Sequence, residues 1–109
     1  MNLKWILEPE ELKALNDFLN ALEKVGITYI HDPEKRPIIK IRGNVVNVPS
    51  IPCDSIYLEQ NRAKKIKVEK VPGAILIRVA DKKKPIPIEV KIPESWRVYF
   101  SEGYLYIFY

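Results

Sequence analysis

The 109-residue chain has one cysteine and one histidine, and these two scarcities exclude several classes of protein. Cys53 alone cannot form an internal disulfide, which excludes a disulfide-stapled scaffold and favours a reducing, cytoplasmic compartment. His31 lies in a His-Asp-Pro-Glu turn, and a lone imidazole in such a turn is more typical of a loop than of a metal site. We therefore expect no metal ion, no cofactor and no catalytic cysteine.

Glycine and long apolar runs are also scarce. The four glycines form no phosphate-binding loop and no nucleophile elbow. No apolar run approaches the roughly 20 residues that a membrane-spanning helix requires, so we expect no membrane association. The chain has a single glutamine and a single threonine beside many lysines and glutamates, which is a thermophile-like composition.

One amphipathic helix is predicted at about residues 9–25. Pro9 suits the first helical position, and Gly26 closes the other end. Apolar residues recur at steps of three and four and form one stripe, which comprises Leu12, Leu15, Phe18, Leu19, Leu22 and Val25.

After Gly26 the apolar period changes to two, which predicts a strand-rich region over about residues 27–109. Short strands are expected at Ile27–Ile30 and Ser55–Leu58. Gly43-Asn44 suits a two-residue hairpin turn between strands Ile38–Arg42 and Val45–Val48. In the strand around Ile86–Ile92 several alternate positions are proline, which predicts a strand that lies at a sheet edge or pairs for only part of its length.

Pro72-Gly73 predicts the turn of a second hairpin, between Lys64–Val71 and Ala74–Ala80, either as a type II turn or as a four-residue loop over Val71–Ala74 with the same pairing. Its register places Val68 opposite Ile77 and Ile66 opposite Val79 on an apolar face. The other face then carries Lys67 directly opposite Arg78.

A third hairpin is predicted from Trp96–Phe100 and Tyr104–Phe108, joined by a three-residue loop. That loop aligns Trp96, Val98, Phe100, Tyr104, Tyr106 and Phe108 on one face. Tyr99, Leu105, Ile107 and Tyr109 then form the other face. Because both faces are apolar, the second needs a cover, which a second sheet, a closed barrel or another subunit would provide.

These elements predict a single α+β domain over residues 1–109. In it, one N-terminal amphipathic helix packs on a mostly antiparallel sheet of about six to eight strands built from three hairpins.

The charge distribution provides the main functional indication. Between Arg62 and Lys91 the chain holds ten basic and three acidic residues, whereas the remainder is net acidic. Like charges facing each other across strands are unfavourable, and a phosphate would relieve that repulsion. The leading hypothesis is therefore non-catalytic binding of DNA or RNA phosphates by Lys65, Lys67, Arg78, Lys82, Lys83 and Lys84. The ordinary alternative is a solvated charged face that prevents aggregation.

The aromatic C-terminal hairpin supports a second hypothesis, a homodimeric structural or protein-interaction module. Its interface would comprise Tyr104, Tyr106, Phe108 and Tyr109, since burial of such side chains against a second copy is favourable. The same alternating aromatic residues are also of the kind that stack bases in single-strand binders.

A metal-dependent nuclease is the remote alternative. Glu89-Val90-Lys91 with Asp81 upstream is similar to the metal site of restriction-type nucleases, in which carboxylates hold Mg²⁺. The pattern departs from that family because Asp81 falls in a turn and Pro93 follows where a helix belongs. We therefore expect that the protein is not an enzyme.

Overall fold

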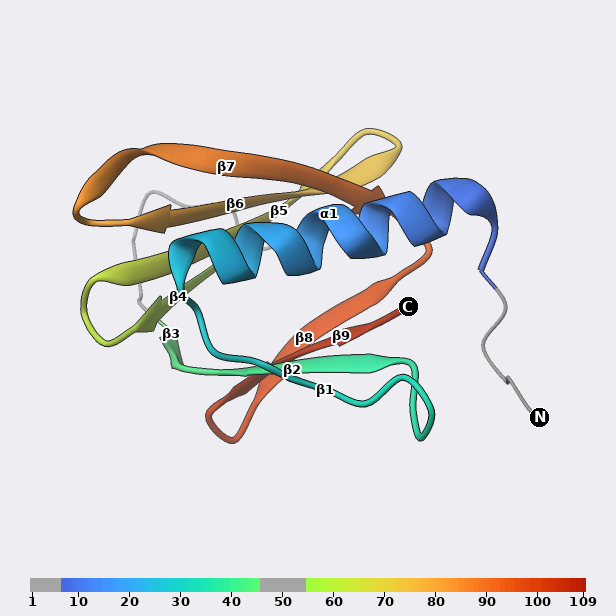
Figure 1. Ribbon diagram of the computed structural model, residues 1–109, viewed down its shortest axis with the longest axis horizontal. Coiled ribbons are helices and arrows are strands. Elements are labelled where there is room, and N and C mark those ends of the chain that lie inside the picture. Colours follow the sequence, from blue (N-terminus) through green and yellow to red (C-terminus); the bar gives the residue numbers. More distant parts are fainter. Residues whose placement is uncertain (1–6, 46–54) are drawn as a thin grey trace.

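The structure, a computed structural model, describes residues 7–45 and 55–109, which form one α-helix and nine β-strands. The helix α1 spans Pro9–Val25. It lies between a four-stranded sheet and a five-stranded sheet, both antiparallel (Figure 1). The predicted α+β class is confirmed. The predicted single sheet is instead two sheets with the helix between them.

The ends of α1 follow from its sequence. The Glu11 carboxylate accepts a hydrogen bond from the Glu8 backbone N–H at 3.0 Å, which satisfies a free donor at the N-terminus. Gly26 ends the helix with a φ of +83°, and its N–H donates to the Leu22 carbonyl at 2.9 Å. Leu12 of the predicted apolar stripe is exposed, whereas Ala14 and Ala21 belong to the buried face of the helix.

The four-stranded sheet has the order β1-β2-β9-β8. Its strands are β1 (Ile30–His31), β2 (Ile38–Arg42), β8 (Arg97–Ser101) and β9 (Tyr104–Phe108). The first strand was predicted at Ile27–Ile30, but the Gln60 side chain holds the backbone of Thr28. Its Oε1 accepts from the Thr28 N–H at 3.0 Å, and the ladder begins only at Ile30, which pairs with Lys40.

The five-stranded sheet has the order β3-β4-β5-β6-β7. Its strands are β3 (Asn44–Val45), β4 (Ser55–Gln60), β5 (Lys64–Val71), β6 (Ala74–Asp81) and β7 (Lys84–Pro93). The proline-containing β7 is an edge strand, as predicted.

The hairpin of β5 and β6 has the predicted register. Val68 pairs with Ile77, and Lys67 lies opposite Arg78. Gly73 has a φ of +79°, the sign that a type II turn requires at its third residue.

The predicted hairpin around Gly43-Asn44 is wrong. β2 pairs with β1 and β9, whereas β3 pairs with β4 in the other sheet. Gly43 is the point at which the chain passes from one sheet to the other. A Cβ atom there would lie 2.8 Å from the Glu59 carbonyl oxygen and 2.9 Å from Leu58 Cγ, so only glycine permits the crossing. The pairings expected for residues 46–48 lie outside the described residues.

The predicted register of the C-terminal hairpin is also wrong, by one residue. Ser101 pairs with Tyr104, so the loop contains only Glu102 and Gly103. Both have positive φ, +49° and +84°, as a type I′ turn requires. Shortening the loop by one residue moves β8 side chains to opposite faces. Tyr99 therefore joins the outward aromatic residues, and Val98 and Phe100 turn inward.

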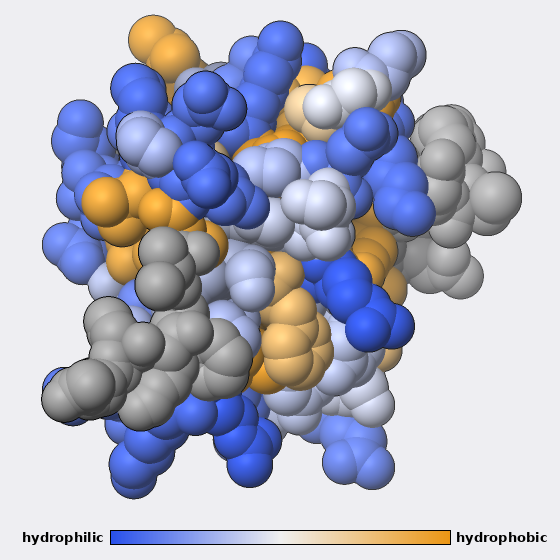
Figure 2. All heavy atoms as spheres, turned by 90° about the vertical axis from the view of Figure 1, so that its right-hand side faces the viewer, coloured by the Kyte–Doolittle hydropathy of each residue, from blue (hydrophilic) through white to orange (hydrophobic). Residues whose placement is uncertain are grey.

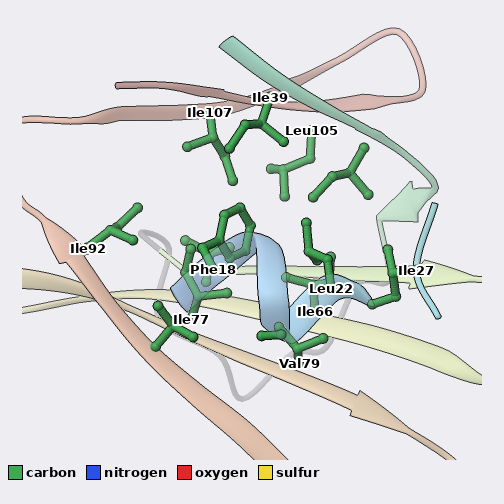
Figure 3. Packing of buried hydrophobic residues seen from close by; sticks show 14 of the residues in the cluster. Phe18, Leu22, Ile27, Ile39, Ile66, Ile77, Val79, Ile92, Leu105 and Ile107 are labelled. Carbon is green, nitrogen blue, oxygen red and sulfur yellow. The ribbon is translucent and has the colours of Figure 1, made fainter. Parts of the chain in front are cut away.

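The buried core connects the helix with both sheets (Figure 3). Phe18 and Leu22 of α1 are fully buried between the two inner faces. The four-stranded sheet contributes Ile39, Ile41, Leu105 and Ile107, and the five-stranded sheet contributes Ile66, Ile77, Val79 and Ile92. The inner face of the C-terminal hairpin is thus covered within the chain, by the helix and the second sheet.

The surface is mostly hydrophilic where α1 begins and the chain ends, and apolar residues emerge there in separate spots (Figure 2). Among the described residues, no helix combines the length and apolar content needed to cross a membrane.

Candidate nucleic-acid interface

The outer face of the five-stranded sheet holds three of the residues predicted to bind phosphate, and each is close to a carboxylate. Arg78 Nε lies 2.7 Å from Glu89 Oε2, on the neighbouring strand β7. Lys67 Nζ lies 3.5 Å from Glu69 Oε1, and Lys65 Nζ lies 3.9 Å from a Glu59 oxygen. The repulsion expected between Lys67 and Arg78 is therefore relieved by neighbouring glutamates. A phosphate here would compete with carboxylates already in place.

The other predicted contacts lie in the turn between β6 and β7, where Lys82 and Lys83 are exposed. Hydrogen bonds from the backbone of Lys82 and Lys83 hold this turn in place. The Lys82 N–H donates to the Ala63 carbonyl at 2.7 Å, and the Lys83 N–H donates to Asp81 Oδ1 at 2.9 Å. Lys84 opens β7. The structure thus places these lysines at one end of the sheet, away from the pair formed by Lys67 and Arg78.

The outer face of the four-stranded sheet is different in kind. Four aromatic side chains from β8 and β9 gather on it, and we call this set the aromatic platform: Tyr99, Tyr104, Tyr106 and Phe108. The Tyr99 ring is stacked with that of Tyr106 at 5.1 Å between centroids and with that of Phe108 at 5.8 Å. Tyr104 lies 6.2 Å from Tyr106 in a tilted arrangement. Tyr99 is 44% exposed, so the platform is open to solvent.

Three cations border the aromatic platform. Lys40 and Arg42 of β2 pair with Tyr106 and Tyr104 across the strands, and Arg97 of β8 pairs with Phe108. Lys40 Nζ lies over the Tyr104 ring, 4.9 Å from its centroid. The Arg42 guanidinium carbon lies 5.9 Å from the same centroid.

Carboxylates are missing from the strands of this sheet. None of β1, β2, β8 and β9 contains an aspartate or glutamate. Among the described residues, no salt bridge within 4.0 Å involves Lys40, Arg42 or Arg97. The cations beside the platform thus lack the close carboxylates of the other sheet, and the nearest acidic side chains share pockets with them, Asp32 with Lys40 and Glu59 with Arg42.

The sequence interpretation missed all three cations. Lys40 and Arg42 alternate with isoleucines, which shows that they face outward together, but the expected hairpin placed Lys40 opposite Asn47. Their position beside Tyr104 and Tyr106 depends on the pairing of β2 with β9, two strands far apart in the sequence.

Tyr109 does not lie on the aromatic platform, although it was predicted to share an interface with its members. Its hydroxyl lies 2.8 Å from His31 Nε2, and its ring lies 5.6 Å from that of the buried Trp96. Partial burial raises the pKa of Tyr109. Burial also lowers the pKa of His31, against the opposing effect of the Asp32 charge. These residues belong to the inner side of the sheet.

The carboxylates of the nuclease-like pattern are already engaged by other groups. Glu89 lies opposite Arg78 and accepts from it, whereas Asp81 lies three residues further along β6 and accepts from the Lys83 backbone. Three residues of strand correspond to roughly 10 Å. In the part of the chain that the structure describes, no group of three or more His, Cys, Asp or Glu side chains is arranged to hold a metal ion.

Comparison of the chain with protein-family models, with curated proteins and with solved structures gave no match. We therefore infer function from the geometry and charge of the described surfaces.

Proposed function

We propose that the protein is a non-catalytic, cytoplasmic nucleic-acid-binding protein that holds a single strand on the aromatic platform. One observation supports this most strongly. Alternate aromatic side chains share an exposed sheet face with three cations, and the strands of that sheet contain no carboxylate. Stacking aromatics with an adjacent positive surface are the combination by which sheet proteins bind single strands.

A base that stacks on Tyr104 would take the place of the Lys40 ammonium. That ammonium occupies the Tyr104 ring face on which a base would stack. A cation–π contact at an exposed site contributes about 0.5–1 kcal/mol, whereas base stacking on an aromatic ring contributes about 1–3 kcal/mol. A base therefore displaces the ammonium favourably, and the released charge remains close enough to pair with the strand's phosphate.

Nucleic-acid binding, the function predicted from the sequence, remains the proposal. We assign its main surface to the four-stranded sheet instead of the five-stranded sheet. The face with Lys65, Lys67 and Arg78 holds glutamates within 4.0 Å of each cation, so its net attraction for phosphate is weak. Lys82 and Lys83 are free of such partners among the described salt bridges and can add non-specific attraction at a distance.

A homodimer packed face to face through Tyr104, Tyr106 and Phe108 is the competing use of the platform. Such an interface would enclose Lys40, Arg42 and Arg97 of both copies without a carboxylate from the strands of this sheet. Burying unpaired like charges is costly, so the charge pattern favours an anionic ligand over a second copy on this face.

The proposal is tested by fluorescence anisotropy with labelled single-stranded and double-stranded oligonucleotides of the same sequence at two salt concentrations. We expect preference for the single strand, because paired bases cannot stack on the platform. Three phosphate contacts predict a slope of log affinity against log salt of about −2, and Arg42→Ala should reduce its magnitude by roughly 0.7.

The control variant is Arg78→Ala, which removes a cation paired with Glu89 and should leave the slope nearly unchanged. Equal affinity for both oligonucleotides, or a larger loss in Arg78→Ala than in Arg42→Ala, would contradict the proposed site.

A further inference from the structure

The two sheets end in edge strands of opposite character. β7 closes the five-stranded sheet, and its prolines at positions 85, 87 and 93 have no N–H to offer another strand. Among the described residues, β8 is the last strand of the four-stranded sheet, over Arg97–Ser101, and it contains neither proline nor lysine. Proteins normally protect their edge strands from pairing, so an unprotected strand of this length suits a specific partner strand.

The hairpin register identifies the backbone groups at this edge. Ser101 and Tyr104 flank the two-residue turn, so they exchange hydrogen bonds with each other. Because such pairs alternate along an antiparallel ladder, Tyr99 and Tyr106 form the next hydrogen-bonded pair. Val98 and Phe100 therefore direct their N–H and C=O groups away from β9, toward the free edge.

We propose that a second copy of this chain pairs with β8 in antiparallel orientation about a twofold axis at Tyr99. This register places Val98 opposite the second copy's Phe100 and satisfies the edge groups of both residues within β8. It also places Arg97 opposite Ser101 of the second copy, so no like charges meet. The strand is thus complementary to itself, as a twofold interface requires.

A cleft beneath the edge supports this pairing. Its volume is about 510 Å³, and its apolar lining combines Trp96 and Val98 with Ile56, Val68 and Ile75 of the five-stranded sheet. Cross-strand neighbours point to the same face, so the second copy's Phe100 extends beside Val98 toward this cleft. Trp96, Val68 and Ile75 are buried, whereas Ile56 and Val98 are partly exposed, so an apolar side chain there covers what remains exposed of those two residues.

The consequence for binding rests on the proposed function. Pairing through the edge leaves both outer faces exposed on the same side of an extended sheet. The two aromatic platforms then join at Tyr99 of each copy and form one continuous surface, so a longer single strand contacts both copies at once.

Site-specific disulfide formation tests the register directly, in a Cys53→Ser background. Across the twofold axis the two Tyr99 positions form a non-hydrogen-bonded pair with Cα atoms roughly 4.5 Å apart, within disulfide range. We expect Tyr99→Cys to form a covalent dimer under mild oxidation. Ser101→Cys is the matched control on the same strand and face. In the proposed register the two copies of position 101 are separated by four strand residues, roughly 13 Å, so Ser101→Cys should remain unlinked.

Light scattering after size exclusion gives the second measurement. The unmodified protein and Val98→Ala should both be dimers. Val98→Pro should be a monomer, because only proline removes the edge N–H, and its circular dichroism spectrum should show that it is folded. A monomeric unmodified protein, or equal cross-linking of the Tyr99→Cys and Ser101→Cys proteins, overturns the pairing.

These measurements contain no oligonucleotide. A monomer that still binds single strands refutes only the pairing, and a dimer that binds none refutes only the proposed function.

Discussion

At the scale of single residues, His31 and Tyr109 form a side-chain contact between β1 and the end of the chain. Their 2.8 Å contact lies on the inner side of the four-stranded sheet, beside the buried Trp96. Burial lowers the pKa of His31 from its ordinary value of 6.5, so the folded protein binds a proton there less readily than the unfolded chain does.

This shift predicts a pH-dependent stability with a definite sign. Well above pH 6.5 the imidazole is neutral in both states, and the full stability is present. As the pH falls through 6.5 toward the lower folded pKa, the unfolded state takes up the proton first, so the free energy of unfolding decreases. Denaturant titrations between pH 7.5 and pH 5.5, a range in which carboxylates titrate little, measure this decrease.

Replacing His31, the only histidine of the chain, is the control. His31→Gln keeps a polar partner for the Tyr109 hydroxyl and should flatten the pH dependence over that range. An equally steep decrease in His31→Gln would assign it to other groups.

Gly43 shows at the same scale what the sequence can and cannot predict. Gly43-Asn44 between two strand-like runs is typical of a hairpin turn, and no local signal distinguishes that turn from a crossing between sheets. The distinction comes from Leu58 and Glu59, whose atoms leave no room for a Cβ at position 43. These contacts between distant residues exist only once the fold has formed.

At the scale of elements, the confirmed predictions are local ones, although the local turn signals at Gly43-Asn44 and in the C-terminal hairpin led to wrong pairings. The helix at Pro9–Val25 and the hairpin of β5 and β6 follow from apolar periods and turn residues within a few positions of each other. The pairing of β2 with β9 has no such signal, and it is this pairing that brings Lys40 and Arg42 beside the aromatic platform. The candidate site was therefore predicted only through its aromatic residues.

In the C-terminal hairpin, the length of the turn determines which side chains of β8 point outward. Glu102 adopts a φ of +49°, which costs an ordinary side chain roughly 1 kcal/mol. The shorter loop still prevails, because it directs Val98 and Phe100 inward against the core and leaves Tyr99 outside.

Relieving that strain should stabilise the hairpin. Glu102→Asn creates an Asn-Gly pair, which is favoured in type I′ turns, and should raise the free energy of unfolding by roughly 1 kcal/mol. Glu102→Ala, which removes the same charge but keeps the strain, is the control and should give little change. Chemical denaturation of the three proteins decides between these outcomes, and a decrease in Glu102→Asn would contradict the assigned turn.

At the scale of the whole molecule, two sheets enclose one helix and present two unlike outer faces. One is a ladder of cations and glutamates in contact, exemplified by Arg78 and Glu89 at 2.7 Å. The other combines aromatic rings with cations on strands that hold no carboxylate. The net charge of +4 is therefore a poor guide to where an anion binds, because the three cations on the outer face of the five-stranded sheet, Lys65, Lys67 and Arg78, each have a glutamate within 4.0 Å.

The central claim is that bases stack on the aromatic platform, and a matched pair of tyrosine variants tests it most directly. Tyr106 belongs to the platform, whereas Tyr57 lies on the outer face of the other sheet, opposite Lys67. The measurement is the affinity of Tyr106→Ala and Tyr57→Ala for one single-stranded oligonucleotide at one salt concentration. We expect Tyr106→Ala to bind roughly 5- to 150-fold more weakly, corresponding to about 1–3 kcal/mol of stacking, and Tyr57→Ala to bind like the unmodified protein. Equal affinities for the two variants, with both folded, would contradict the account.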